Sequence, residues 1–182
     1  MASTTAPLGE ATRSAMGRRG EPHVISLLVR DEPGALVRIA LIFARRGYNI
    51  ESLSACPDAS APHLSRMTIV SSGDPAILEQ IRRQLGKLVG VVHALDHTGQ
   101  AVVEAEVALL KIRCGLRDRN EILQIAEHFE AKVVDFGAES VILRVHGGSE
   151  KLDAMVELVQ PLGLVELVRS GKVLLTRGLE TT

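Results

Sequence analysis

An order of strands and helices that occurs twice along the chain is the strongest constraint on its fold. Apolar runs at 24–29 and 107–113 each begin a series of strand, amphipathic helix, two strands, a second helix and a final strand. Each βαββαβ series can form one sheet covered by two helices. The order therefore predicts an α+β protein with two ferredoxin-like domains in tandem.

The hydrophobic period and the turn residues locate the expected elements. In the first half we expect a helix from Pro33 to about Arg46 that buries one stripe, and a second helix that opens at Asp74-Pro75. The stripe of the first helix is Leu36, Ile39, Ala40 and Phe43. The expected strands are 24–29, 50–55, 64–70 and 89–95 in the first half, and 107–113, 132–136, 140–145, 163–169 and 172–176 in the second.

The domain boundaries follow from composition. Residues 1–21 are rich in Ala, Ser, Thr and Gly and lack the apolar core of a secretory signal, so we expect a disordered N-terminal tail. An organellar leader is the less favoured alternative, and Met16 is an alternative start. Residues 22–97 form the first expected domain and 102–178 the second, joined through the polar segment DHTGQA at 96–101.

Composition excludes several classes of protein. The formal net charge is −1, and the chain has no Trp, one Tyr and three Phe, which argues against a nucleic-acid partner. No apolar run approaches the roughly 20 residues of a membrane span, so we expect no membrane. Cys56 and Cys114 lie far apart, which is typical of a reducing compartment, and we expect the cytoplasm.

Catalytic and metal-binding patterns are absent from the sequence. None of the common nucleophile, zinc-protease, phosphate-loop or dinucleotide motifs occurs, so we expect no catalytic residues. His93 and His97 have the spacing of a helical metal pair, but their segment is an expected strand that runs into a loop, and no metal is expected. Gly147-Gly148-Ser149 is interpreted as a helix start with Ser149 as N-cap rather than as a phosphate loop.

One strand-to-helix junction is a candidate binding site. Residues 31–36 read Asp-Glu-Pro-Gly-Ala-Leu, and the free N–H groups at a helix start attract a small anion such as a carboxylate. Gly34 has no Cβ, so a ligand could approach its backbone closely. The same Pro-Gly pair also makes an ordinary turn between a strand and a helix, and the spacing alone favours this purely structural role.

Four longer motifs add a family resemblance. They are RGYNIESL at 46–53, LSRMTI at 64–69, EQI…QL…KLV at 79–89 and RSG…L…RG at 169–178. With these motifs the chain, from about 23 to 178, resembles the small regulatory subunit of acetolactate (acetohydroxyacid) synthase, whose N-terminal half is an ACT domain. PGAL at 33–36 alone would indicate only some ACT domain.

The resemblance implies a dimer that binds a branched-chain amino acid, typically valine, between two ACT domains. It implies that the ligand carboxylate meets the N–H groups of Gly34 and Ala35, and that Asp31 contributes from the same chain. Asn49 of the partner subunit would complete the polar contacts, with Ile50 beside it. Some relatives carry Asn where this chain has Asp31, and a carboxylate there can hold the ligand ammonium but repels its carboxylate.

The resemblance also implies the wider function. A non-catalytic subunit would bind the catalytic subunit, raise its activity and transmit feedback inhibition by valine. The thiamine diphosphate and magnesium of the reaction, with FAD as a further candidate, would belong to that catalytic subunit, which condenses pyruvate with pyruvate or 2-oxobutanoate towards valine, leucine and isoleucine. Two alternatives stay open: a free-standing amino-acid-sensing ACT protein with another target, and a metal-binding enzyme or sensor.

Overall fold

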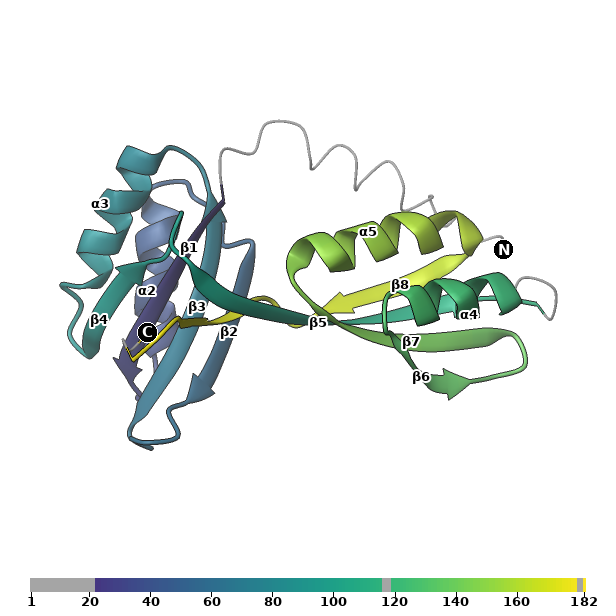
Figure 1. Ribbon diagram of the computed structural model, residues 1–182. Helices are drawn as coiled ribbons and strands as arrows, with labels where there is room; N and C mark the ends of the chain where they lie inside the picture. The colour runs from purple at the N-terminus through teal and green to yellow at the C-terminus, as the bar shows by residue number, and fades with distance from the viewer. Residues whose placement is uncertain (1–21, 116–118, 180–181) are drawn as a thin grey trace, which may run out of the picture.

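The structure is a computed structural model, and it describes residues 22–115, 119–179 and 182. The expectation of a disordered tail at 1–21 lies outside these residues. The chain forms two antiparallel sheets, each with helices on one face (Figure 1). The predicted tandem of ferredoxin-like domains is confirmed.

The first domain has a four-stranded sheet with strand order β2-β3-β1-β4. Asp74 caps α3 as its turn residues predict, because its carboxylate accepts a hydrogen bond from Ala76 N at 2.8 Å and Pro75 follows as the first helical residue. The elements are β1 (Pro22–Arg30), α2 (Ala35–Arg45), β2 (Ser52–Pro57), β3 (Leu64–Ser72), α3 (Pro75–Leu85) and β4 (Val91–Asp96). Side chains from α2 and α3 pack on the sheet to form one core: Ile25, Leu27, Val29, Ile39, Ile42, Phe43, Met67, Ile69, Leu78, Ile81, Leu85 and Ala94.

The buried stripe of α2 differs from the expected one. Ile39, Ile42 and Phe43 are buried, whereas Leu36 is 43% exposed. Leu36 lies in the first turn of α2, and together with Val37 and Leu41 it forms an apolar surface that the chain itself does not cover. Hydrophobic spacing identifies the apolar face of a helix. It does not distinguish a face that packs in the protein's own core from one that another molecule covers.

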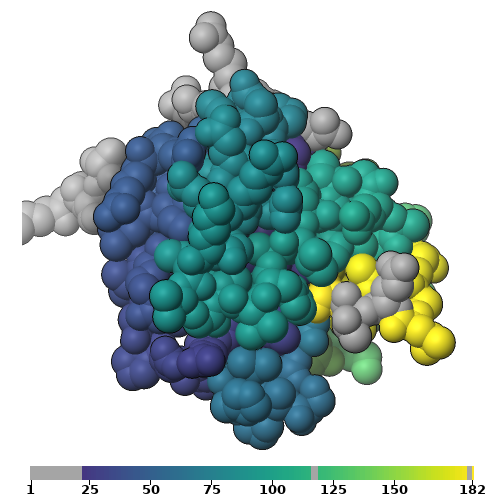
Figure 2. Space-filling view, turned by 90° about the vertical axis from the view of Figure 1, so that its left-hand side faces the viewer, coloured from purple at the N-terminus to yellow at the C-terminus, as the bar shows by residue number. Residues whose placement is uncertain are grey.

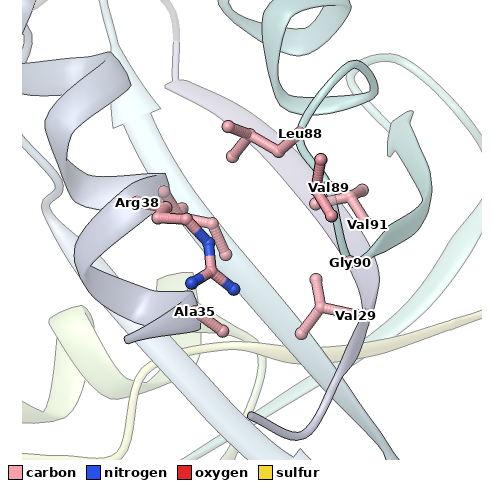
Figure 3. A pocket seen from close by; sticks show the side chains of 8 residues that line it. Val29, Ala35, Arg38, Leu88, Val89, Gly90 and Val91 are labelled. Atoms are coloured by element: carbon pink, nitrogen blue, oxygen red, sulfur yellow. The ribbon is translucent and has the colours of Figure 1, made fainter. Parts of the chain in front are cut away.

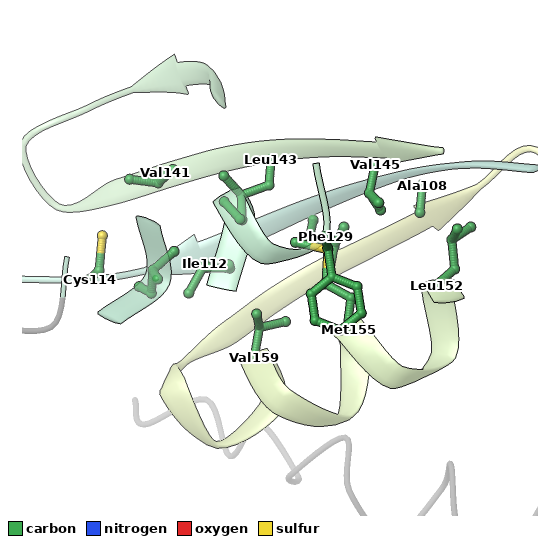
Figure 4. Packing of buried hydrophobic residues seen from close by; sticks show 13 residues of the cluster. Ala108, Ile112, Cys114, Phe129, Val141, Leu143, Val145, Leu152, Met155 and Val159 are labelled. Carbon is green, nitrogen blue, oxygen red and sulfur yellow. The ribbon is translucent and has the colours of Figure 1, made fainter. Parts of the chain in front are cut away.

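The second domain has the sheet order β6-β7-β5-β8. Its elements are β5 (Val102–Arg113), α4 (Arg119–His128), β6 (Lys132–Phe136), β7 (Ser140–Gly147), α5 (Ser149–Val159), the short 3-10 helix η1 (Gln160–Leu162), β8 (Leu164–Arg169) and β9 (Val173–Thr176). Both helices pack on the sheet through a separate core, seen in Figure 4: Ala108, Leu110, Ile112, Cys114, Ile122, Ala126, Phe129, Val141, Leu143, Val145, Leu152, Met155 and Val159.

Strand β5 is longer than expected, because it begins at Val102 rather than at 107. Its first residues, 102–105, pair with β9, and its later residues, 106–113, pair with β7. Figure 1 shows β5 running from beside the first sheet into the centre of the second. The expected polar segment at 96–101 therefore leads into a continuous strand that belongs to the link between the domains as well as to the second sheet.

The expectation that Ser149 caps α5 is wrong. Gly148 occupies the N-cap position, and Ser149 is the first helical residue. The Ser149 hydroxyl instead donates to the carboxylate of Glu106 on β5, with an O–O distance of 3.1 Å. The buried carboxylate of Glu106 and the local backbone compete for the hydrogen bond of the Ser149 hydroxyl, and the carboxylate accepts it.

Candidate functional site

The start of α2 has the geometry of a turn built around a glycine. Gly34 precedes the helix with φ +82°, a left-handed conformation that glycine adopts without steric cost. The N–H of Ala35 donates to the Glu32 carbonyl at 3.1 Å, and that of Arg38 donates to the Gly34 carbonyl at 3.1 Å. The N–H groups of the intervening first-turn residues Leu36 and Val37 have no acceptor inside the helix and point out of its start.

The predicted contacts Asp31, Gly34 and Ala35 lie together at this end of α2. The Asp31 side chain is exposed, and its backbone N–H is fixed by the His63 carbonyl at 2.9 Å. The Ala35 N–H already donates to the Glu32 carbonyl, so it is not the free donor that the family resemblance implies. Helix polarity nevertheless favours an anion here.

The other two predicted contacts, Asn49 and Ile50, follow the opposite end of α2. The Asn49 side chain is exposed, and its backbone carbonyl accepts a hydrogen bond from Ser71 Oγ at 2.8 Å. Ile50 is half-buried against the first core. Because α2 has 11 residues and rises 1.5 Å per residue, about 16 Å separates its two ends. One chain therefore does not bring all five predicted residues together.

A small recess beside the helix start contains a residue that sequence reasoning missed. Its lining consists of Val29, Ala35, Arg38, Ile39 and the turn 88–91 (Figure 3). The Arg38 guanidinium lies between two glycines, because a Cβ added to Gly34 would be 3.6 Å from its Nη1 and one added to Gly90 would be 3.8 Å from its Nη2. Its nearest carboxylate, that of Glu32, is 4.0 Å away. Arg38 is one helical turn after Gly34, the one signal that could have found it.

The apolar surface of α2 borders this end of the molecule. Leu36, Val37 and Leu41 are 43%, 62% and 45% exposed, respectively. Figure 2 shows the first domain from the side of its helices, with the blue surface that includes α2 next to the teal surface of α3 and β4. Burying these side chains against a second molecule would stabilise an assembly by removing apolar area from water.

Two further observations bear on the alternatives. His93 lies in β4, as expected, and His97 follows it in a loop, where its Nε2 is 2.7 Å from Ser26 Oγ. Among the described residues, no three His, Cys, Asp or Glu side chains are grouped so that they could hold a metal ion. No helix in the same part of the chain has both the length and the apolar character needed to cross a bilayer.

Comparison with known proteins covers both domains. Residues 25–93 match the family described as the AHAS small subunit-like ACT domain, and residues 105–178 match the family described as the small subunit of acetolactate synthase. This chain belongs to the acetolactate synthase small subunit family. Its first domain is accordingly an ACT domain.

Individual members of the acetolactate synthase small subunit family align with almost the whole chain. The small subunit from Mycolicibacterium smegmatis is 40% identical over 156 residues, which cover 86% of this chain and 91% of the relative. A probable small subunit from Methanothermobacter thermautotrophicus is 38% identical over 162 residues, covering 88% and 96%. The crystal structure of the small subunit from Thermotoga maritima superposes with a TM-score of 0.78 at 36% identity, covering 87% of this chain and 98% of that one.

Proposed function

We propose that this chain is the regulatory subunit of acetolactate synthase, which binds the catalytic subunit, raises its activity and mediates feedback inhibition by valine. The observation that carries the proposal is the alignment of both domains with small subunits of this enzyme over 86–88% of the chain. The match of residues 105–178 to the small-subunit family argues against a free-standing ACT protein with another target. Thiamine diphosphate, magnesium and any FAD would belong to the catalytic subunit.

The effector would bind at a seam between two copies of the ACT domain. Its carboxylate would lie at the start of α2, close to the backbone of Gly34 and Ala35, where the helix dipole favours negative charge. The first-turn N–H groups that point out of the helix and the guanidinium of Arg38 supply donors of the right kind. The exposed carboxylate of Asp31 would attract the ligand ammonium.

The second copy would supply the remaining contacts. Asn49 and Ile50 follow the end of α2 opposite to Gly34, and the helix between them is about 16 Å long, so one protomer would contribute Gly34 and its partner Asn49. An amide side chain can both donate and accept, which suits a zwitterionic ligand. The exposed residues Leu36, Val37 and Leu41 support the pairing, because a side-by-side dimer would cover them.

Inhibition requires that valine binds one arrangement of the dimer more tightly than another. The arrangement favoured by valine would activate the catalytic subunit less. We also propose a cytoplasmic location. Both described cysteines, the exposed Cys56 and the buried Cys114, are free thiols, which supports a reducing compartment.

A titration of the purified chain tests the proposal. Calorimetry with valine, leucine and isoleucine measures binding, and the rate of acetolactate formation by the catalytic subunit measures activation with and without each amino acid. We expect the chain to raise the rate and valine to reverse the increase. A catalytic subunit whose rate is the same with and without this chain would contradict the proposal.

A further inference from the structure

The turn between β8 and β9 contacts both domains. Ser170 and Gly171, with Arg169 at the end of β8, make up the RSG motif at 169–171 that the binding site leaves unexplained. Ser170 fixes the turn to the second domain, because its backbone N–H donates to the Val107 carbonyl at 2.9 Å and its Oγ accepts from the Val107 N–H at 3.0 Å. The turn therefore follows the backbone of β5.

Arg169 strengthens this attachment with an ion pair to the buried carboxylate of Glu106. Its Nε is 2.9 Å from Oε1 of Glu106 and its Nη2 is 2.5 Å from Oε2, and its Nη1 donates to Asp153 on α5. Glu106 is only 5% exposed and also accepts from Ser149. Charge-assisted, bidentate hydrogen bonds of this kind hold a side chain in one geometry.

Gly171 makes the contact with the first domain. A Cβ built at Gly171 would lie 3.3 Å from the Cβ of Ser52 and 3.7 Å from the carbonyl carbon of Leu53, both on β2. Such a separation is closer than side chains normally pack. The backbone of the turn thus lies directly against the Ser52 side chain and the Leu53 backbone of β2 in the ACT domain.

The turn contacts the N-terminal end of β2, which directly follows the candidate site residues Asn49 and Ile50. Asn49 and Ile50 precede Ser52 by three and two residues, and pairing with β3 begins where the Glu51 N–H donates to the Val70 carbonyl at 2.9 Å. A shift of the backbone at 49–50 would therefore displace Ser52 against a turn that is fixed to the second sheet.

We propose that the Arg169–Ser170–Gly171 turn couples the first residues of β2 to the sheet of the second domain, and that it transmits effector binding between the two domains. The transmission part rests on the proposed function. A displacement of β2 reaches the second domain only if the turn packs against β2 without a gap. Close-packed interfaces of this kind transmit small displacements.

A glycine pair gives a matched test. Gly171→Ala adds a methyl group at φ +77° that meets Ser52, whereas Gly178→Ala adds one at φ +82° with no described atom within 4 Å. Both variants place an alanine at a similar positive φ, so the difference between them reports the contact with β2. The double variant Ser52→Gly/Gly171→Ala removes the Cβ that the new methyl group would meet.

Two measurements decide the matter. Hydrogen exchange of the free full-length chain should show at least threefold faster exchange of β2 amides in Gly171→Ala than in Gly178→Ala. In the holoenzyme at saturating valine, Gly171→Ala should retain at least twice the residual activity of Gly178→Ala, with valine affinity of the free chain within twofold of wild type. The double variant should return both measures towards wild type.

Each measurement also has an outcome that overturns the proposal. Equal β2 exchange in the two glycine variants would show that the turn does not restrain β2. Equal residual activity, with wild-type inhibition intact, would show that the contact transmits nothing. A wild-type holoenzyme that valine does not inhibit would instead overturn the proposed function. The hydrogen-exchange comparison would still show whether the turn restrains β2.

Discussion

Gly34 directly precedes α2 and Asn49 follows its opposite end, so a helix about 16 Å long lies between them. A ligand the size of valine cannot touch both residues of one chain. If both contribute to effector binding, each site must combine Gly34 of one protomer with Asn49 of the partner subunit.

Mixing two inactive variants tests this arrangement. Gly34→Asp and Asn49→Ala should each abolish valine binding in their own dimers. After mixed refolding, heterodimers should contain one intact site and one doubly altered site, so calorimetry should recover about a quarter of the wild-type sites if subunits exchange at random. No recovery from heterodimers confirmed by mass would contradict a shared site.

Gly34→Asp should also separate inhibition from activation. The new carboxylate occupies the place of the ligand carboxylate at the helix start and repels it, so the valine response should disappear while activation of the catalytic subunit persists. Gly99→Asp, at a similar φ of +71° with no described atom within 4 Å of its Cβ, is the control for strain. Unchanged valine binding in Gly34→Asp would refute the site assignment.

Arg38→Gln should weaken valine binding by about tenfold, equivalent to about 1.4 kcal/mol, because a charge-assisted hydrogen bond to the ligand carboxylate is lost. Arg83→Gln is the control, since Arg83 is an exposed residue of α3 and donates to Glu79 at 2.8 Å. Calorimetry checks both variants. Equal affinities for the two would mean that Arg38 does not touch the effector.

Stability should fall in acid because of Glu106. Burial alone raises the pKa of its carboxyl, but hydrogen bonds from Arg169 and Ser149 outweigh burial and hold the pKa below the ordinary 4.5. The stabilisation is therefore complete above about pH 4.5 and is lost as pH falls through the lowered pKa. Urea midpoints should decline less steeply with acid in Glu106→Gln than in the exposed control Glu157→Gln; parallel declines would argue against a role for Glu106.

Arg169→Met should destabilise the chain by about 2 kcal/mol at neutral pH, because it leaves the carboxylate of Glu106 buried and unpaired. Arg169 is itself partly exposed, so the loss is smaller than for a fully buried pair. Chemical denaturation measures it. Lys111→Met, which breaks an exposed pair with Glu166, should change stability by less than about 1 kcal/mol.

A leucine pair tests the second core. Leu143→Ala removes a fully buried side chain from β7 and should cost about 3 kcal/mol. Leu109→Ala, on the opposite face of the same sheet and 42% exposed, should cost less than about 1 kcal/mol. Equal losses in thermal or urea unfolding would mean that a second molecule buries Leu109 in solution.

Much of the fold follows from local patterns. Asp74-Pro75 predicts the start of α3, and the apolar runs at 132–136 and 140–145 predict β6 and most of β7, because capping and strand alternation involve residues a few positions apart. The family motifs predict the chain's family. They also direct attention to the start of α2, although whether an effector binds there stays a prediction.

Local sequence patterns did not predict three other features, each for a physical reason. Leu36 belongs to the predicted apolar stripe of α2 yet is exposed, because helical spacing does not identify what packs against the stripe. Ser149 looks like an N-cap, but its hydroxyl bonds Glu106, a residue 43 positions away. Arg38 carried no motif, and only the fold reveals its position between Gly34 and Gly90.

The sequence by itself determined the elements, their order and the family, because helix caps, hydrophobic periods and turn residues act over a few neighbouring positions. Only the tertiary structure decided that Gly34 and Asn49 are far apart in one chain, and that Gly171 lies against Ser52 across more than a hundred residues of sequence. Such relationships depend on the path of the whole chain, since contacts between distant segments form only where packing of the two cores brings them together.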